Sequence, residues 1–374
     1  MKKILILRNP LFKTAIKFGF TDLLLDLYWG KNNKNEWEKI KETGIISAPK
    51  SIWFEPTMRC NLNCIFCHQS ERRKLSKKEL NINEIEKIFT EAKKMKISNI
   101  EMIGGEIFVR KDIFEILDLI EEKNMKVKLG TNGILLDKNR IEKLKRYNCI
   151  ESISISIDGP VEIHNKLRNY KFAYQKAVEA VKMLSGGNYI LVIYTVIFPE
   201  SENIIEFLIK LAKELKVDRI TFMPEMFYSK NDYSNTQKYL NLSPNEKMFV
   251  EIKEIENVEE YYNKMVSIIR KIKKIRKEEG VFAPIFPRIS YKYPEQFFKN
   301  RPIKKLICKH LFSLTIIENG DVLICPFIHR KIGNLLTNSI EEIWNNPTMI
   351  ELRKKILSCN LLPVCKKCCA VDYV

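Results

Sequence analysis

Residues 51–67 read SIWFEPTMRCNLNCIFC and join a short apolar run to three closely spaced cysteines. The run Ile52–Glu55 is rich in aromatic and β-branched side chains and predicts a strand. Cys60, Cys64 and Cys67 follow it at once in a CxxxCxxC spacing. We therefore expect a cysteine site in the loop that leaves this first strand.

After this strand, apolar runs alternate with helical patterns as far as residue 224. Strands separated by helices must pair in parallel through right-handed crossovers. The pattern therefore predicts an α/β fold built on an open sheet or an incomplete barrel. The further strands expected are Asn99–Ile103, Lys126–Thr131, Glu151–Ile157, Tyr189–Ile197 and Arg219–Pro224. The helices expected lie near 83–96, 112–123, 137–147, 171–184 and 201–215, with Asn83 and Asp112 among the opening residues.

Unusual glycine and polar motifs stand where these strands end. GGE occupies 104–106, TNG occupies 131–133 and SISIDG occupies 154–159. In parallel α/β folds, ligands bind at the carboxyl ends of the strands, in the loops that lead into the helices. All of these motifs, together with the cysteines, are therefore predicted to share one rim of the sheet.

Three thiolates in one loop leave a metal site incomplete. Structural zinc takes four ligands, and the nearest candidate for a fourth, His68, is adjacent to Cys67 and poorly placed to join it. A [4Fe-4S] cluster held by three cysteines keeps one iron open for a substrate or cofactor. The cluster fits this spacing better, and zinc remains the alternative.

The CNLNCIFC segment after a strand of a βα protein resembles the radical SAM superfamily. The resemblance covers residues 50–224 and implies a partial (βα)6 barrel of the TIM type. It implies that Cys60, Cys64 and Cys67 bind three irons of a [4Fe-4S] cluster, and that S-adenosylmethionine chelates the fourth. Reduction of the sulfonium then yields methionine and a 5′-deoxyadenosyl radical, which abstracts a hydrogen atom.

The same resemblance implies further cofactor-binding residues. Gly104 and Gly105 would let the backbone approach the methionine moiety, and Glu106 would receive its ammonium group. Ser156 and Asp158 would bind the ribose hydroxyls, Arg168 the carboxylate, and Val196 with Ile197 the adenine. Taken singly, the GGE and Asp158–Gly159 segments are ordinary turns.

A second group of cysteines lies near the end of the chain. Cys308 and Cys325 bracket an expected hairpin with Asn319–Gly320 at its turn, and Cys365 and Cys368 form a CxxC. The order resembles the SPASM/twitch extension, which implies one auxiliary [4Fe-4S] cluster on these four residues. A zinc knuckle on the same four is the alternative. Cys359 and Cys369 replace a ligand or stay free, and Cys149 is expected in the core.

Four regions follow from these patterns. An N-terminal helical extension covers 1–48, the radical SAM core 49–226, an aromatic-rich insert 227–302 and the SPASM/twitch-like domain 303–374. Residues 11–29 predict an amphipathic helix, packed on the protein or resting on a membrane. In the insert, Met265, Ile268, Ile272 and Ile275 form the apolar stripe of a basic helix, which covers a core or binds RNA or acidic lipid.

The formal charge of +18 favours anionic partners without naming one. No export signal or spanning segment is recognised, so we expect a cytoplasmic enzyme. The expected substrate is a peptide or a small molecule such as a lipid precursor, and the electron donor a ferredoxin or flavodoxin. Peripheral contact of the basic surface with membrane or RNA, an RNA-modifying enzyme and a non-catalytic iron-sulfur scaffold are the alternatives.

Overall fold

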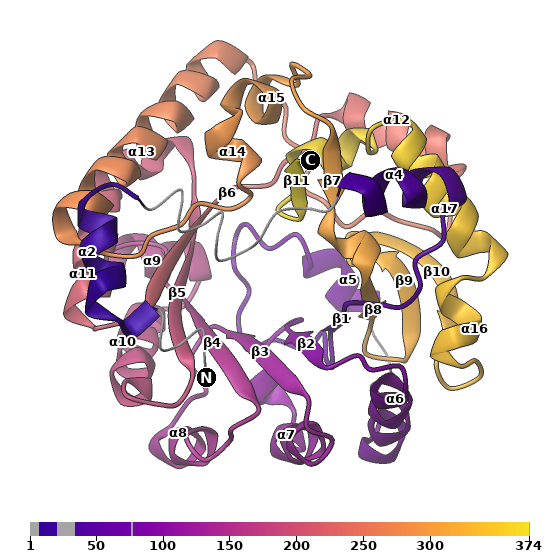
Figure 1. The fold of residues 1–374 in the computed structure, drawn as a ribbon. Coiled ribbons are helices and arrows are strands. Elements are labelled where there is room, and N and C mark those ends of the chain that lie inside the picture. The colour runs from indigo at the N-terminus through magenta and orange to yellow at the C-terminus, as the bar shows by residue number, and fades with distance from the viewer. Residues whose placement is uncertain (1–6, 21–33, 76–77, 374) are drawn as a thin grey trace.

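The structure is a computed structural model that describes residues 7–20, 34–75 and 78–373. Its core is a nine-stranded sheet in which six neighbouring strands run parallel in chain order. Figure 1 shows these strands curving side by side, as expected of a partial barrel. They are β1 (Ser51–Phe54), β2 (Asn99–Met102), β3 (Lys126–Thr131), β4 (Ile150–Ser156), β5 (Ile190–Ile197) and β6 (Arg219–Pro224).

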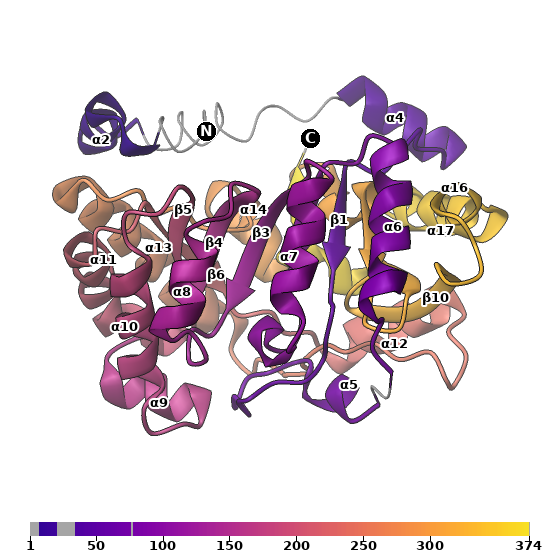
Figure 2. The same cartoon turned by 90° about the horizontal axis from the view of Figure 1, so that it is seen from below.

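Helices connect the strands and cover the outer face of the sheet (Figures 1 and 2). The α-helices of this part are α5 (Ser70–Leu75), α6 (Ile82–Lys94), α7 (Ile113–Glu122), α8 (Lys138–Leu144), α9 (Val161–Arg168), α10 (Ala173–Leu184) and α11 (Ile205–Glu214). Two 3-10 helices precede α7 and α11, namely η1 (Ile107–Val109) and η2 (Pro199–Ile204).

The two faces of the sheet differ in chemistry. Apolar side chains such as Ile52, Ile100 and Val127 are buried on the helix-covered face. On the other face Glu101 and Lys128 are register partners and form an ion pair at 2.9 Å, yet their side chains are 42% and 41% exposed. A buried apolar face drives helix packing, and the inner face of the barrel stays polar.

All six predicted strands are confirmed to within one residue at each end. One predicted helix start needs correction. Asn81, not Asn83, caps α6, because its side chain and that of Glu84 exchange hydrogen bonds with each other's backbone N–H. Asp112 does stand at the N-cap of α7, but its carboxylate pairs with Arg110 instead of capping the helix.

Helix α9 was not predicted. Its eight residues are mostly polar and bury His164, so they carry little of the apolar periodicity that identifies a helix. It ends at Asn169, which adopts the left-handed conformation that asparagine tolerates at a helix end.

Three of the C-terminal strands, between residues 313 and 334, extend the core sheet, whereas the strands at 306–308 and 371–373 pair with each other in a separate two-stranded sheet. The predicted hairpin with its turn at Asn319–Gly320 is confirmed, and its first strand pairs in parallel with β1. The elements after β6 are α12 (Lys230–Leu240), α13 (Val258–Glu279), α14 (Ile289–Lys292), α15 (Pro294–Lys299), β7 (Leu306–Cys308), η3 (Lys309–Phe312), β8 (Ser313–Ile316), β9 (Asp321–Cys325), β10 (Ile328–Asn334), α16 (Ile340–Trp344), α17 (Pro347–Ser358), η4 (Pro363–Lys367) and β11 (Val371–Tyr373).

The basic helix of the insert is α13, and its predicted apolar stripe is buried. It packs against α11 and against the N-terminal helix α2 (Pro10–Lys17). The ring of Phe12 in α2 contacts that of Phe282, and Arg8 pairs with Asp218 at 2.7 Å. The stripe therefore covers a core.

The predicted helix over residues 11–29 is described only in part, because residues 21–29 lie outside the described residues. The second described N-terminal helix, α4 (Lys34–Thr43), packs against α17. Among the helices that the structure describes, none combines the length and apolar character needed to cross a bilayer.

Candidate iron-sulfur and cofactor site

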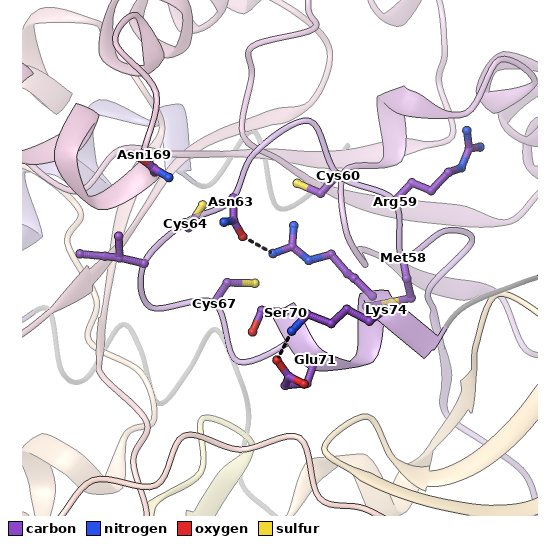
Figure 3. Close-up of a pocket in the computed structure, with 12 residues that line it drawn as sticks. Met58, Arg59, Cys60, Asn63, Cys64, Cys67, Ser70, Glu71, Lys74 and Asn169 are labelled. Carbon is purple, nitrogen blue, oxygen red and sulfur yellow. Dashed lines mark hydrogen bonds and ion pairs between the residues drawn. The ribbon is translucent and has the colours of Figure 1, made fainter.

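The three cysteines of the CxxxCxxC segment line one open cleft of about 850 Å³ beyond the end of β1 (Figure 3). The loop turns tightly between them, since the Cys67 N–H donates to the Cys64 carbonyl at 3.3 Å and the Leu62 N–H to the Cys60 sulfur at 3.4 Å. The conformation of this loop therefore brings Cys60, Cys64 and Cys67 into one cleft, as their spacing predicts. Arg59, Asn63 and Arg73 share the cleft.

Burial disfavours the thiolate form at two cysteines of this cleft. Burial raises the pKa of Cys60 and of Cys64, and the positive charge of Arg168 opposes the rise at Cys64. Thiolates are the iron ligands, so deprotonation would accompany metal binding, which supplies the compensating charge. The three thiols share one accessible cleft, which fits a three-cysteine cluster site.

The GGE segment packs against the backbone that leads into the cysteine loop. The N–H of Gly105 donates to the Thr57 carbonyl at 2.9 Å, and the N–H of Glu106 donates to the Arg59 carbonyl at 2.8 Å. A Cβ on Gly105 would clash with the Arg59 carbonyl and lie 2.6 Å from that of Met58. Glycine is required here because two backbones meet at this point.

Glu106 is buried and already hydrogen-bonded within the protein. Its carboxylate accepts from the Thr131 hydroxyl at 2.7 Å, the Asn132 N–H at 2.8 Å and the Phe108 N–H at 3.1 Å. Burial raises the pKa of this carboxyl group, and these hydrogen bonds oppose the rise. Glu106 therefore joins the GGE and TNG segments, as their shared rim predicts. Its role toward an ammonium group stays a prediction.

Asp158 and Arg168 form a buried pair that reaches the cysteine loop. The Arg168 Nε atom donates to Asp158 at 2.7 Å, and its Nη1 atom lies 3.9 Å from the Cys64 sulfur. Burial disfavours the charged carboxylate, but Arg168 and His164 outweigh it and lower the pKa of Asp158 to about 2. The sequence placed Arg168 near the cofactor; the structure places it beside the cluster-binding loop.

The remaining predicted contacts lie at the same rim. Ser156 ends β4 half-buried, and the Val196 N–H donates to the Asp158 carboxylate at 3.3 Å. The second Asp158 oxygen is held by Arg168. Ribose binding by Ser156 and Asp158 and adenine binding beside Val196 and Ile197 are not tested and stay predictions.

His68 does not line the cleft that the three cysteines share. Its ring packs against Phe327 at 5.2 Å, and burial followed by the charge of Arg72 lowers its pKa to about 4. His68 therefore belongs to the packing between the loop and the C-terminal region.

The sequence reasoning missed two arginines of α5, of which one holds the cysteine loop and the other joins α5 to β1 and the C-terminal region. Arg73 donates to the Leu62 carbonyl at 2.7 Å. Arg72 is buried between two carboxylates, Glu55 at the end of β1 and Glu318 in the C-terminal hairpin turn. The run SERRKL after the last cysteine was the available signal, since arginines there can reach the loop carbonyls.

The four predicted C-terminal ligands come together from separate elements. Cys308 ends β7, Cys325 ends β9, Cys365 lies in η4 and Cys368 follows it. Burial and then the charge of Cys368 raise the pKa of Cys308 to about 12, and burial with the neighbouring thiols raises the pKa of Cys325 and Cys365 as well. Four thiols that influence one another fit a single cluster.

Cys359 and Cys369 differ in position. The Cys359 thiol donates to the Ile356 carbonyl at 3.3 Å at the end of α17. Cys369 instead contacts Cys368, and this contact followed by burial raises the pKa of Cys368.

Within the described ranges, no three cysteine, histidine or acidic side chains lie close enough to share one metal ion. Each thiolate of a cubane binds a different iron, so cluster ligands stand farther apart than zinc ligands.

Two family models match this chain. The family model of the Radical SAM superfamily matches residues 54–212, and that of an iron-sulfur cluster-binding domain, SPASM, matches residues 308–369. The spacing of the C-terminal cysteines left open whether they bind zinc or an iron-sulfur cluster, and the second family model is that of an iron-sulfur cluster-binding domain.

Two curated relatives illustrate the range of similarity. The AdoMet-dependent heme synthase of Methanosarcina barkeri is 25% identical over 87% of this chain and 93% of its own length. The antilisterial bacteriocin subtilosin biosynthesis protein AlbA of Bacillus subtilis is 35% identical, but over only 37% of this chain and 31% of its own length.

Solved structures share the fold. Streptococcus suis SuiB bound to its precursor peptide SuiA superposes with a TM-score of 0.66 at 18% identity, over 96% of this chain and 83% of SuiB. The enzyme anSMEcpe with bound AdoMet superposes with a TM-score of 0.58 at 18% identity, over 80% of this chain and 82% of its own. The partial barrel and its C-terminal extension are therefore common to all three.

Proposed function

We propose that this chain, which belongs to the radical SAM superfamily and carries a SPASM domain, abstracts a hydrogen atom from a substrate held on the inner face of its barrel. One observation carries the proposal. Cys60, Cys64 and Cys67 line a single accessible cleft at the rim of a parallel sheet. A [4Fe-4S] cluster with S-adenosylmethionine supplies an electron for sulfonium cleavage, and thereby a 5′-deoxyadenosyl radical.

The protein's own groups have separable tasks in this proposal. The three thiols hold the cluster, while Gly104 and Gly105 bring the backbone of the next strand against their loop. Arg168 adds a positive charge beside Cys64, where it favours thiolate and a nearby substrate or cofactor carboxylate. Ser156, Asp158 and Glu106 complete the polar rim that we assign to S-adenosylmethionine.

We propose a peptide as the substrate. The inner face offers both charges and rings, since Trp53, Glu101 and Lys128 are adjacent in register and Tyr194 is half-buried on β5. Such a mixture suits backbone and side-chain groups better than a purely apolar wall does. Relatives support the choice, because a PqqA peptide cyclase is 24% identical over 51% of this chain and SuiB was crystallised with its precursor peptide.

A small molecule is the second candidate. The relative that aligns over 93% of its own length is a heme synthase, whereas the peptide cyclase aligns over 50% of its length. The aromatic-rich insert places the buried ring of Tyr228 close to the C-terminal cysteines, so this part of the chain has the apolar character that an apolar small molecule would need.

Anaerobic reconstitution tests the cleavage step. The iron-loaded protein with dithionite and S-adenosylmethionine should form 5′-deoxyadenosine, and Cys64→Ala should form none. Cys149→Ala is the matched control, because Cys149 is buried in the core with its thiol 3.9 Å from the Leu117 carbonyl. Absence of 5′-deoxyadenosine from the intact protein would favour the non-catalytic scaffold.

Substrate class needs a second readout. Candidate peptides and small molecules labelled with deuterium should transfer deuterium to 5′-deoxyadenosine only when they occupy the site. A steep fall in RNA binding with rising salt, together with transfer from labelled RNA, would instead favour the RNA-modifying alternative. All ten cysteines are free, which suits a reducing cytoplasm.

A further inference from the structure

Exposed apolar side chains gather beside the cysteine loop. Ile65, at the tip of that loop, is 63% exposed, and Phe172, just before α10, is 49% exposed. Ile163 and Tyr170 are 38% and 39% exposed at the two ends of α9. These four residues are called the α9 patch. Single exposed apolar residues are ordinary, but a group of them marks a contact surface.

The α9 patch is connected to the candidate cluster site by short links. The Ile65 N–H donates to the Leu167 carbonyl at 3.0 Å, which fixes the loop tip against α9. Arg168, the next residue, reaches the Cys64 sulfur at 3.9 Å. The rings of Tyr170 and Phe172 meet edge to face at 6.2 Å. The α9 patch is therefore surface directly adjoining Cys64.

The surroundings of the α9 patch are basic. Lys166 and Lys171 are exposed, and neither forms an ion pair within the part of the chain that the structure describes. The Lys171 ammonium lies 5.4 Å from the ring centre of Phe172. Arg73, which lines the neighbouring cleft, adds a further positive charge. Its helix, α5, lies at the same end of the molecule as α9 (Figure 2).

We propose that the α9 patch docks an acidic one-electron donor protein of the ferredoxin or flavodoxin class. This inference rests on the proposed function. In the step, one electron passes from the reduced donor to the cluster, so the donor is oxidised by one electron and the cluster is reduced by one, with no bond or proton exchanged.

Three features favour this occupant. Electron transfer requires a short path, and the α9 patch adjoins a cluster thiol. Exposed aromatic residues with lysines beside them are a common composition of a protein contact, and positive charge favours an acidic partner. The small extent of four exposed side chains suits the transient complexes typical of redox partners.

The test compares two assays that differ only in the electron donor, which is a protein in one and a chemical reductant in the other. The double variant Lys166→Glu/Lys171→Glu reverses both lysines. Lys94→Glu/Lys182→Glu is its matched control, with the same change in net charge on exposed lysines in the last turns of α6 and α10. The probe is an acidic low-potential ferredoxin, reduced and freed of excess reductant, and the readout is 5′-deoxyadenosine.

We expect the Lys166/Lys171 variant to match the wild type with dithionite and to lose about tenfold in rate with a low concentration of ferredoxin, because reversed edge charges slow association. The control variant should lose little. Phe172→Ser should also weaken the ferredoxin-driven rate alone; serine is a favoured N-cap residue, so α10 should keep its start.

Two results would overturn the proposal. Equal ferredoxin-driven rates in the two double variants would show that only net charge matters. A parallel fall with dithionite would place the lysines in the cleavage site instead. If the wild type forms no 5′-deoxyadenosine with dithionite, the proposed function has failed first, so the two failures are distinguishable. Direct binding of ferredoxin, measured by titration at low and high salt, gives a readout independent of turnover.

Discussion

Arg168 lies with its Nη1 atom 3.9 Å from the sulfur atom of Cys64. It is held there by Asp158, which accepts from its Nε atom at 2.7 Å and is fully buried. A cation beside a thiol favours the thiolate, the form that binds iron. The Asp158–Arg168 pair therefore connects the end of β4 to the cysteine loop. Through it, two motifs that are distant in the sequence interact electrostatically.

Replacing Asp158 with asparagine should destabilise the protein in a pH-dependent manner. The folded pKa of Asp158 is about 2, below its ordinary 3.8, so the ionised carboxylate stabilises the fold above about pH 4. This stabilisation, about 2 kcal/mol by the size of the shift, is lost as the pH falls from 3.8 towards 2. The difference in unfolding free energy between wild type and Asp158→Asn should shrink over the same interval.

Chemical denaturation at a series of pH values checks this expectation. Glu162→Gln is the control, because Glu162 is an exposed carboxylate on the same helix, α9. It should change stability by less than about 0.5 kcal/mol at every pH. A stability difference for Asp158→Asn that stays constant down to pH 2 would contradict the assigned pairing.

Arg72 should be among the most sensitive positions outside the candidate site. Its side chain is 3% exposed and pairs with Glu55 and with Glu318, the latter at 3.0 Å. Arg72→Gln leaves two carboxylates buried without a counter-charge, and breaking a buried pair costs about 3–5 kcal/mol. Thermal unfolding should show the loss.

The neighbouring lysine of α5 provides the comparison for Arg72. Lys74 pairs with Glu71 at 2.6 Å, but both side chains are 70% exposed. Lys74→Gln should therefore cost less than about 1 kcal/mol. Similar losses in the two variants would mean that Arg72 does not join the loop to the C-terminal hairpin.

The sequence predicted the sheet well because its strands are short runs rich in β-branched residues, such as Ile190–Ile197, between regular helices. It also predicted which motifs meet, since the ends of parallel strands share a rim. It missed α9, whose residues show little periodicity. It also missed the pairing of β8 with β1, because a contact between residues about 260 apart leaves no local pattern.

Residue roles were harder to predict than residue positions. Cofactor binding by Gly104, Gly105 and Asp158 stays a prediction, but each also has a role that was not predicted. The two glycines admit the backbone of Thr57 and Arg59, and one oxygen of Asp158 holds Arg168. When several side chains can reach one hydrogen-bond acceptor, the three-dimensional arrangement decides which of them binds it. Composition and spacing do not contain that information.

Gly105 should tolerate no side chain. A Cβ there would lie 2.6 Å from the Met58 carbonyl oxygen and closer still to that of Arg59, so the strand end or the loop before Cys60 must move. Gly105→Ala should therefore lower cluster content and abolish 5′-deoxyadenosine formation, measured by iron analysis and turnover. Gly186→Ala is the control, because a Cβ there meets nothing within 4 Å.

Gly186 has a φ of +83°, so alanine there should cost about 1 kcal/mol in stability and leave turnover unchanged. Normal cluster loading in Gly105→Ala would indicate that the loop adapts without loss. The position of the cysteines would then not depend on the GGE segment.

Iron analysis of variants should distinguish the C-terminal cysteines that bind iron from those that do not. With two [4Fe-4S] clusters, the reconstituted wild type should hold about eight iron atoms per chain, and Cys325→Ser about four. Cys359→Ser should retain about eight, because its thiol is engaged with the Ile356 carbonyl at 3.3 Å and not with the other thiols. If Cys359→Ser also loses half of the iron, Cys359 is a ligand and the set Cys308, Cys325, Cys365 and Cys368 is wrong.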